Sequence, residues 1–430
     1  MDNDVTRVQN AGPPRELPTL SVVSIVSAGH LLSHFYLLTL PPLFPLLVAD
    51  FDATNAQLGL MVSMIYLATF VFQIPAGEFV DRIGAKRVFV IGVVLSALGT
   101  MLIGLATSYL FLLAFAFVAG IGQAAFHPAD YALLDAVTAD DEEGKSFGVH
   151  TFAGFVGFAA APPIVGTLGL LYGWQTALVI VGAAGLAFGL FAQFAMGPVY
   201  LQQVAAADDP GSTVDSSGSV SDDRGYDLEA DGSGESEGRF GSLTLLRQPA
   251  VLGMFVFFVV VTISDIGIQA FTAIFLVEGF GYEETIGNTT LTLFLAATAI
   301  GVLVGGWLAD RFDFFIVIVC SLLATSVVFG LTVTPLVDRG PTAAMAIWST
   351  AGFVFGLALP SRDRAINALS DAGDTGKSFG IVYTGLPLGG FVGPVVIGLA
   401  IDYVGLFSGF AVNAICFAIA AVIVYVVRST

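Results

Sequence analysis

The sequence contains little charge for its length. Only 11% of its 430 residues are Asp, Glu, Lys or Arg, whereas 56% are hydrophobic. An ordinary soluble domain has about 25% charged residues, because its surface must interact with water. The composition therefore argues against a soluble protein and indicates that a lipid bilayer surrounds most of the chain.

Positive charge is the scarcer sign. The chain has 15 Lys and Arg against 34 Asp and Glu, which gives a formal net charge of −19. Such a surface repels nucleic acid and gains nothing at an anionic lipid surface, so we expect no nucleic acid partner. The acidic surplus resembles that of proteins from salt-rich cytoplasms, from which we expect a halophilic archaeal source.

Motifs of catalysis and cofactor binding are also lacking. The two cysteines, Cys320 and Cys416, lie in apolar segments without a metal or redox spacing, and we expect both to be small buried hydrophobic residues. The four histidines lack the His-Glu-x-x-His spacing of a metalloenzyme. The pentapeptide GKSFG occurs at 144–148 and 376–380, without the earlier glycine of a phosphate-binding loop or the strand that precedes a nucleophile elbow. We therefore predict no enzyme activity, no cofactor and no metal site.

Long apolar segments are what the sequence has in abundance. A helix needs about 20 apolar residues to cross a bilayer core of about 30 Å, and a barrel strand would show about ten alternating residues instead. Twelve segments fit the helical pattern and predict an all-α polytopic membrane protein: 20–48, 57–79, 88–106, 109–134, 147–172, 174–196, 249–277, 286–308, 314–336, 342–369, 379–401 and 406–427.

The basic residues predict the orientation of these segments. With the N-terminus in the cytoplasm, every Lys and Arg except Arg339 falls on the cytoplasmic side, so we expect both termini there, in the plasma membrane. Residues 199–242 are rich in Asp, Glu, Ser and Gly and predict a disordered cytoplasmic linker. The expected divisions are a tail at 1–19, a six-helix bundle at 20–198, this linker, and a second bundle at 243–430.

The two predicted bundles carry related sequences. Residues 120–137 and the following GKSFG match residues 352–369 and the second GKSFG at a shift of 232 residues, and GEFVDR at 77–82 matches GWLADR at 306–311 at a shift of 229. Two pairs at nearly one period indicate duplication of a six-helix unit, giving pseudo-symmetric bundles.

The stretch GEFVDRIGAKR, residues 77–87, resembles the signature between helices two and three of the major facilitator superfamily. The resemblance implies secondary active transport of a small molecule by alternating access. We expect a monomer whose partners are its substrate, protons and the lipid bilayer. The resemblance also implies that Asp81 and Arg82, with Asp310 and Arg311 in the second copy, belong to a cytoplasmic gate.

A finer likeness concerns the direction of transport. HLLSH at 30–34 and GIGQAAFHP at 120–128 resemble the fosmidomycin-resistance branch, which exports drugs in exchange for protons. Its Asn-Asp pair is replaced here by Ser33 and His34, and its Glu after His-Pro by Ala129 and Asp130. Proton-coupled efflux is thus the first expectation. Uptake of a small organic anion by symport, and a non-transporting membrane sensor or scaffold, are the alternatives.

Polar side chains within the first-half segments are candidate substrate or proton sites, because ionisable groups at bilayer depth usually face a cavity. His30 and His34 lie one helical turn apart at mid-membrane depth, and either could carry a proton. His127 and Asp130 share a face of the fourth segment with Gln123 one turn away, while Pro128 between them predicts a kink. His150 is a weaker candidate and Asp135 a candidate for the inner gate.

In the second half, Asp265 and Gln269 share a face deep in the seventh segment. With no basic residue within a turn, Asp265 is the strongest candidate to bind and release a proton. Arg362, Asp363 and Arg364 lie near the cytoplasmic end of the tenth segment. Arg362 stands where the repeat places Asp130, so we expect the two to face each other as an opposite-charge pair in a cytoplasmic gate.

Overall fold

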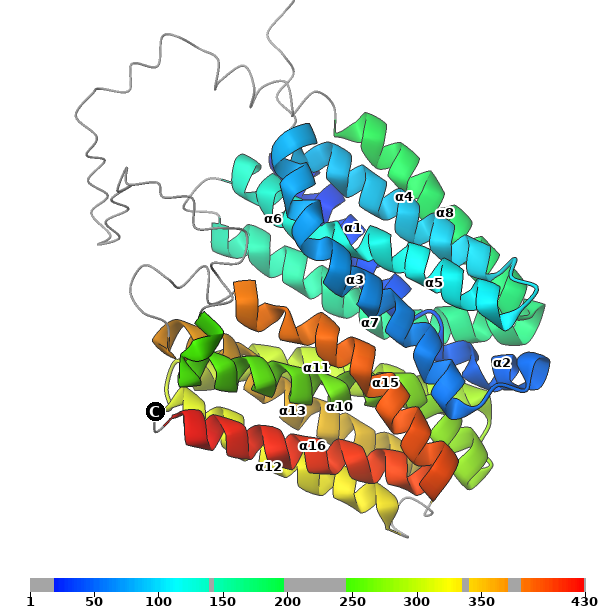
Figure 1. Ribbon diagram of the computed structural model, residues 1–430, viewed down its shortest axis with the longest axis vertical. Coiled ribbons are helices and arrows are strands. Elements are labelled where there is room, and N and C mark those ends of the chain that lie inside the picture. Colours follow the sequence, from blue (N-terminus) through cyan, green and yellow to red (C-terminus); the bar gives the residue numbers. More distant parts are fainter. Residues whose placement is uncertain (1–18, 139–142, 197–244, 335–339, 370–379, 429–430) are drawn as a thin grey trace, which may run out of the picture.

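The computed structural model describes residues 19–138, 143–196, 245–334, 340–369 and 380–428, and all twelve predicted segments are helices in it (Figure 1). The all-helical, twelve-span prediction is therefore confirmed. The first half contains α1 (Thr19–Leu37), α2 (Phe44–Phe51), α3 (Asn55–Ile83), α4 (Ala85–Ile103), α5 (Tyr109–Ala124), α6 (Phe126–Val137), α7 (Glu143–Tyr172) and α8 (Trp174–Ala195). The second half contains α10 (Pro249–Phe280), α11 (Glu284–Ala309), α12 (Phe314–Gly330), α13 (Pro341–Leu369), α15 (Gly385–Val404) and α16 (Leu406–Val427). The predicted linker, and all of the predicted tail except Thr19, lie outside the described residues.

The helices form two bundles, with α1 to α8 in one and α10 to α16 in the other (Figure 1). Matching glycine contacts agree with the sequence duplication. A Cβ atom on Gly120 would collide with the carbonyl oxygen of Ile65, and one on Gly352 would collide with that of Phe294. These pairs are related by the same shifts of 232 and 229 residues that relate the sequence motifs. The two bundles thus share one packing of their second and fourth spans.

The fourth span is broken where the sequence predicts a kink. Helix α5 ends at Ala124, Ala125 is a turn residue whose N–H bonds the carbonyl oxygen of Gly122, and α6 begins at Phe126. Pro128 has no N–H to donate to the carbonyl four residues earlier, and its ring crowds that carbonyl. The break separates α6, which carries His127 and Asp130, from α5.

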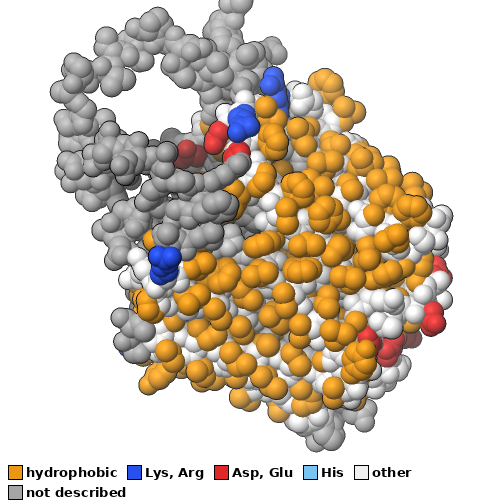
Figure 2. All heavy atoms as spheres, viewed as in Figure 1, with side chains coloured by type: hydrophobic (Ala, Val, Ile, Leu, Met, Phe, Trp, Pro, Cys, Tyr) orange, Lys and Arg blue, Asp and Glu red, His pale blue; other side chains and the backbone are white. Residues whose placement is uncertain are grey.

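The molecule has two chemically different ends. We call the end at which α1 begins and α16 finishes the terminal end, and the opposite one the distal end. In the described part of the chain, every Lys and Arg lies at or near the terminal end: Arg82, Lys86, Arg87, Lys145, Arg247, Arg311, Arg362, Arg364 and Arg428. The distal end carries acids: Asp50, Asp52, Glu278, Glu283, Glu284 and Asp402. Between the ends, the face shown in Figure 2 is mostly hydrophobic and carries almost no charged side chains, as a membrane requires. Cytoplasmic placement of the terminal end stays a prediction.

Cysteine burial differs from expectation. Cys320 is exposed and Cys416 only half-buried, because both lie on bundle surfaces where lipid replaces the protein core as the apolar surroundings. Hydrophobicity alone does not distinguish these two environments in a membrane protein.

The bundles meet in their distal halves, along α3 against α15 and α7 against α11. A Cβ atom on Gly59 of α3 would collide with the backbone of Pro394, and Gly166 of α7 packs against Asn288. Figure 1 shows α3 crossing α15 near the distal end, while the ends of α6 and α7 are separated from α10 and α15 at the terminal end.

Candidate functional site

All four histidines of the chain come together inside the first bundle, from three helices. His30 and His34 belong to α1, His127 to α6 and His150 to α7. The His30 ring centroid lies 4.3 Å from that of His34, 5.6 Å from that of His127 and 3.9 Å from that of His150. The sequence predicted His30 with His34 as one pair and His127 with Asp130 as another, but not that they meet, because that proximity arises only when the three helices pack.

The carboxylate of Asp130 lies at the centre of this group. Its Oδ2 atom is 3.2 Å from Nδ1 of His30 and 3.7 Å from Nε2 of His150. Asp130 is fully buried, and His30 and His150 are also buried. We call these five residues, His30, His34, His127, Asp130 and His150, the histidine cluster. Its acidic member and its histidines form the largest concentration of titratable side chains within the described membrane interior.

Small residues allow the three helices to approach so closely. A Cβ atom on Gly154 of α7 would stand 2.7 Å from Nε2 of His30 and 2.8 Å from Nδ1 of His34. One turn further, a Cβ atom on Gly157 would collide with the carbonyl oxygen of Leu31. Glycines on α7 thus admit the α1 histidines, as small residues commonly do where membrane helices pack closely.

Gln123, predicted as a substrate contact, holds two helices together. Its Nε2 atom donates a 2.8 Å hydrogen bond to the carbonyl oxygen of Ser33, so it ties the end of α5 to α1 beside His34. This contact positions the cluster and occupies one amide hydrogen.

A second polar site lies between the bundles. Gln269 donates a 3.0 Å hydrogen bond from Nε2 to Oδ1 of Asp265, as their spacing on α10 predicts. Both line a cavity of about 50 Å³, whose other walls are Phe155, Phe158, Phe294, Leu295, Thr298, Phe355 and Leu359. Typical small-molecule sites occupy about 300–1,000 Å³, so the cavity can take water but no organic solute in this conformation. Phe158 also lies 4.3 Å from the His34 ring, centroid to centroid, and separates this central cavity from the histidine cluster.

Arg362 lies one turn beyond the cavity-lining Leu359 on α13. Its Nε atom bonds Oδ1 of Asp363 at 3.0 Å, and its guanidinium carbon lies 4.9 Å from the centroid of the Phe258 ring. Tyr383, just before α15, donates a 2.8 Å bond to the same Asp363 oxygen. The arginine is thus held by Asp363 and Phe258 at a position one helical turn from the cavity lining, and it is only 18% exposed.

The expected ion pair between Asp130 and Arg362 is not formed. Asp130 contacts histidines of its own bundle, whereas Arg362 is paired with its chain neighbour Asp363. The repeat predicted equivalent positions correctly but not partners, because the four histidines have no counterpart in the second half.

The other predicted gate residues make contacts within single bundles. Arg364 bonds Asp310 and donates a 2.7 Å bond to the carbonyl oxygen of Ala309, and Arg311 lies over Trp307 with 4.2 Å between its guanidinium carbon and the ring centroid. In the first bundle, Arg82 lies 3.6 Å from Glu78. Asp81 and Asp135 are exposed. In this conformation the described terminal-end pairs therefore do not bridge the two bundles.

A contact between the two bundles lies at the distal end. The sequence patterns did not predict it. Asp402 of α15 accepts 2.9 Å hydrogen bonds from the backbone N–H groups of Asn55 and Ala56 and from Nδ2 of Asn55, at the N-terminus of α3. An anion at a helix N-terminus is stabilised by free N–H groups and by the helix dipole. No pattern around Asp402 indicated this partner, since an acid after an apolar run also marks an ordinary helix end.

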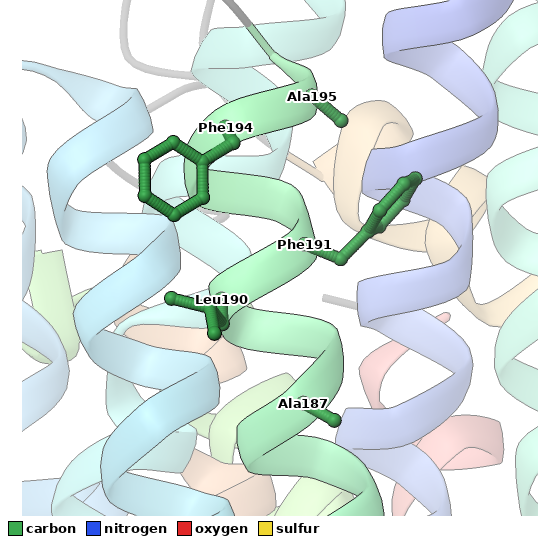
Figure 3. A pocket seen from close by; sticks show the side chains of 5 residues that line it. All are labelled: Ala187, Leu190, Phe191, Phe194 and Ala195. Carbon is green, nitrogen blue, oxygen red and sulfur yellow. The ribbon is translucent and has the colours of Figure 1, made fainter.

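A hollow on the outside of α8 is of a different kind. Figure 3 shows its lining residues, Ala187, Leu190, Phe191, Phe194 and Ala195, projecting from one helix to either side. Leu190, Phe191 and Phe194 are all more than half exposed, and none of the five has a polar side-chain atom. This surface fits lipid chains and lacks the polar groups that would orient a solute.

Comparison with known proteins relates this architecture to one family. Residues 26–287 and 255–430 match the family model described as "Major Facilitator Superfamily". The chain is 25% identical over 368 residues to the D-galactonate transporter of Escherichia coli O6:H1, covering 81% of each chain. It is 24% identical over 291 residues to the membrane sensor protein UhpC of Salmonella typhimurium, covering 66% of this chain and 62% of that one.

A solved structure has the same fold. The crystal structure of a bacterial homologue of the human lysosomal transporter Spinster, in an inward-facing and occupied conformation, superposes with a TM-score of 0.70. It covers 96% of this chain and 98% of that one at 17% sequence identity, which shows likeness of fold alone.

Proposed function

The chain belongs to the major facilitator superfamily, and we propose that it is a secondary transporter that carries a small organic anion together with protons by alternating access. The observation that supports an anion is the partly buried guanidinium of Arg362 beside the central cavity. A guanidinium presents donors in a fork that matches a carboxylate or phosphate. The relative named for D-galactonate, a sugar acid, is consistent with this chemistry.

Asp265 supplies the coupling in this proposal. Its carboxylate and a substrate anion would compete for the charge of Arg362, because Asp265 lines the same cavity as Leu359, one helical turn from Arg362. When Asp265 takes up a proton, the competition is removed and the anion binds more tightly. Proton and anion therefore bind together and release together, which is symport.

Competition for Arg362 favours symport, although the sequence patterns placed efflux first. Efflux by exchange requires proton and solute to exclude each other, whereas competition between Asp265 and an anion for Arg362 makes them cooperate. Export of a drug-like compound, as the fosmidomycin-resistance likeness implies, is the competing proposal. A pH gradient distinguishes the two by the direction of solute flux.

The conformation also fits the proposed cycle. Asp402 and the α3 N-terminus join the bundles at the distal end, while the described charged pairs of the terminal end stay within single bundles. If the terminal end is cytoplasmic, as its basic residues predict, this is an inward-facing state. Rocking of the bundles about the central cavity would then expose Arg362 and Asp265 to the other side.

A sensor is the second candidate, because the matched UhpC protein is named a membrane sensor. A sensor with this fold would bind the anion at Arg362 without net flux. Both candidates are tested in proteoliposomes with sugar acids, sugar phosphates and small carboxylates as labelled probes, selected first by their shift of thermal stability.

We predict that Arg362→Gln lowers proton-driven uptake of the selected anion by about 10–100-fold, since hydrogen bonds to charged groups contribute about 1.5–3 kcal/mol. Arg428→Gln is the matched control, because Arg428 also pairs with an acid of the second bundle, Asp313, and is not a predicted site or gate residue. Uptake by Arg362→Gln at the unmodified rate would remove Arg362 from substrate binding. Binding without flux in the unmodified protein would favour the sensor.

A further inference from the structure

The histidine cluster has no part in the anion site, from which Phe158 separates it. We propose that His30, Asp130 and His150 form a binding site for one divalent transition-metal ion, with Zn²⁺ as the representative ion. The proposal is independent of the transported solute and of its direction.

The spacing of the three side chains carries the inference. One ligand atom from each, all buried, lies within 4.8 Å of the others. In a tetrahedral Zn²⁺ site with bonds of about 2.0–2.1 Å, ligand atoms are about 3.3 Å apart. Oδ2 of Asp130 is already 3.2 Å from Nδ1 of His30 and 3.7 Å from Nε2 of His150. The two histidine ligand atoms lie within 4.8 Å of each other, so side-chain rotations that bring them to the tetrahedral spacing would complete three positions around an ion.

Unpaired polar atoms give a second, independent indication. Within the described residues, Oδ1 of Asp130 and both ring nitrogens of His150 are buried without a hydrogen-bond partner. Buried polar atoms are rarely left unsatisfied, because each costs about 1–3 kcal/mol. The bond between His30 and Asp130 accounts for one carboxylate oxygen only. A cation bound by the Asp130 carboxylate and by Nε2 of His150 would give one of these ring nitrogens a partner and offset the buried carboxylate charge.

The donor set selects the class of ion. Two imidazoles and one carboxylate suit Zn²⁺, Co²⁺, Ni²⁺ or Fe²⁺, whereas Ca²⁺ and Mg²⁺ prefer oxygen ligands throughout. Both cysteines lie in the other bundle, so thiolate ligands are not part of the site. Three protein ligands leave a fourth position open to water, as in catalytic rather than structural zinc sites.

Entry to the site is by way of Tyr131 on α6. Its ring stacks on His127 at 5.8 Å and lies 5.9 Å from the ring of His150, centroid to centroid, and the residue is 49% exposed. Tyr131 thus contacts two rings of the cluster and also reaches the surface. Rotation of Tyr131 would admit an ion without separation of the helices.

The test is Co²⁺ binding to the purified full-length protein in detergent, with any histidine tag removed, followed by visible ligand-field absorption and competition with Zn²⁺. We expect one Co²⁺ per chain and displacement by Zn²⁺. His150→Gln and Asp130→Asn should each weaken binding by at least about tenfold, since even residues that only orient a metal ligand change affinity by about 10–100-fold. His127→Gln is the matched control, because His127 belongs to the cluster but not to the three-ligand set, and it should retain binding.

Equal binding by the unmodified protein and by His150→Gln would overturn the proposal, and so would a loss in His127→Gln as large as in His150→Gln. Should a variant fail to fold, X-ray absorption at the zinc edge of the loaded unmodified protein decides. Imidazole scattering with a nitrogen and oxygen shell supports the site. Sulfur ligands, an oxygen-only shell as expected from the acidic segments, or no retained zinc would each contradict it.

Discussion

At the scale of the residue, one carboxylate closes the distal end. Asp402 accepts three hydrogen bonds from Asn55 and Ala56 of the other bundle, two of them from backbone N–H groups that the helix itself leaves free. Both oxygens are used, so an amide in its place would lose the charge and one acceptor. Most other charged pairs among the described residues lie within one bundle, so few contacts of this kind join the two bundles.

We predict that Asp402→Asn shifts the protein toward a state open at the distal end. A helix N-terminal carboxylate at an exposed position contributes about 1 kcal/mol, which corresponds to a change of about fivefold in the ratio of the two states. The measurement is the distance distribution between spin labels at Leu105→Cys and Tyr403→Cys, both exposed at the distal end, with Cys320 and Cys416 replaced by Ser.

Asp50→Asn is the control for this measurement. Asp50 is also a distal acid, but it accepts hydrogen bonds from Trp174 and Gln175 of its own bundle. An unchanged distance distribution in Asp402→Asn, or an equal shift in both variants, would show that Asp402 does not hold the bundles together.

At the scale of the element, the break between α5 and α6 positions His127 and Asp130. Helix α6 spans 12 residues, so it is a lever of about 18 Å. The equivalent proline of the second half, Pro360, lies inside a helix that continues from Pro341 to Leu369. Proline therefore permits a break here without compelling one, and α6 also packs against α1 and α4.

We predict that Pro128→Ala lets α5 and α6 join as one helix and moves the terminal end of α6 sideways by about 6 Å, as an 18 Å lever turned by about 20° would. Spin labels at Phe79→Cys and Asp135→Cys, in the cysteine-free background, report the displacement. Pro360→Ala in the same labelled background should change nothing. A constant distance in Pro128→Ala would mean that packing alone keeps the span broken.

Sequence patterns predicted where the helices lie along the chain better than which residues of different helices contact one another. Twelve apolar runs identified the spans, and Pro128 identified the break between α5 and α6, because length and proline chemistry act locally. The break between α1 and α2 in the first segment was not predicted. The meeting of His150 with Asp130, and of Asp402 with Asn55, joins residues 20 and 347 positions apart. Such contacts depend on which helices pack together. The likeness of the halves even suggested a wrong partner, since it paired Asp130 with Arg362.

At the scale of the whole molecule, the two halves have diverged into different sites on one scaffold. The first holds four histidines around Asp130, and the second holds Asp265 and Arg362 beside a cavity that both bundles line. Glycine contacts at equivalent positions preserve the helix packing in both. A carrier of this kind needs only one coupled site between its bundles, which leaves the first half free for another ligand.

The central claim is that protonation of Asp265 controls anion binding at Arg362, and transport by Asp265→Asn in proteoliposomes tests it most directly. The asparagine resembles the protonated carboxyl at every pH. We predict that the variant exchanges labelled for unlabelled anion across the membrane at near the unmodified rate, yet accumulates none when a pH gradient is imposed. Accumulation that still follows the pH gradient in Asp265→Asn would contradict the account.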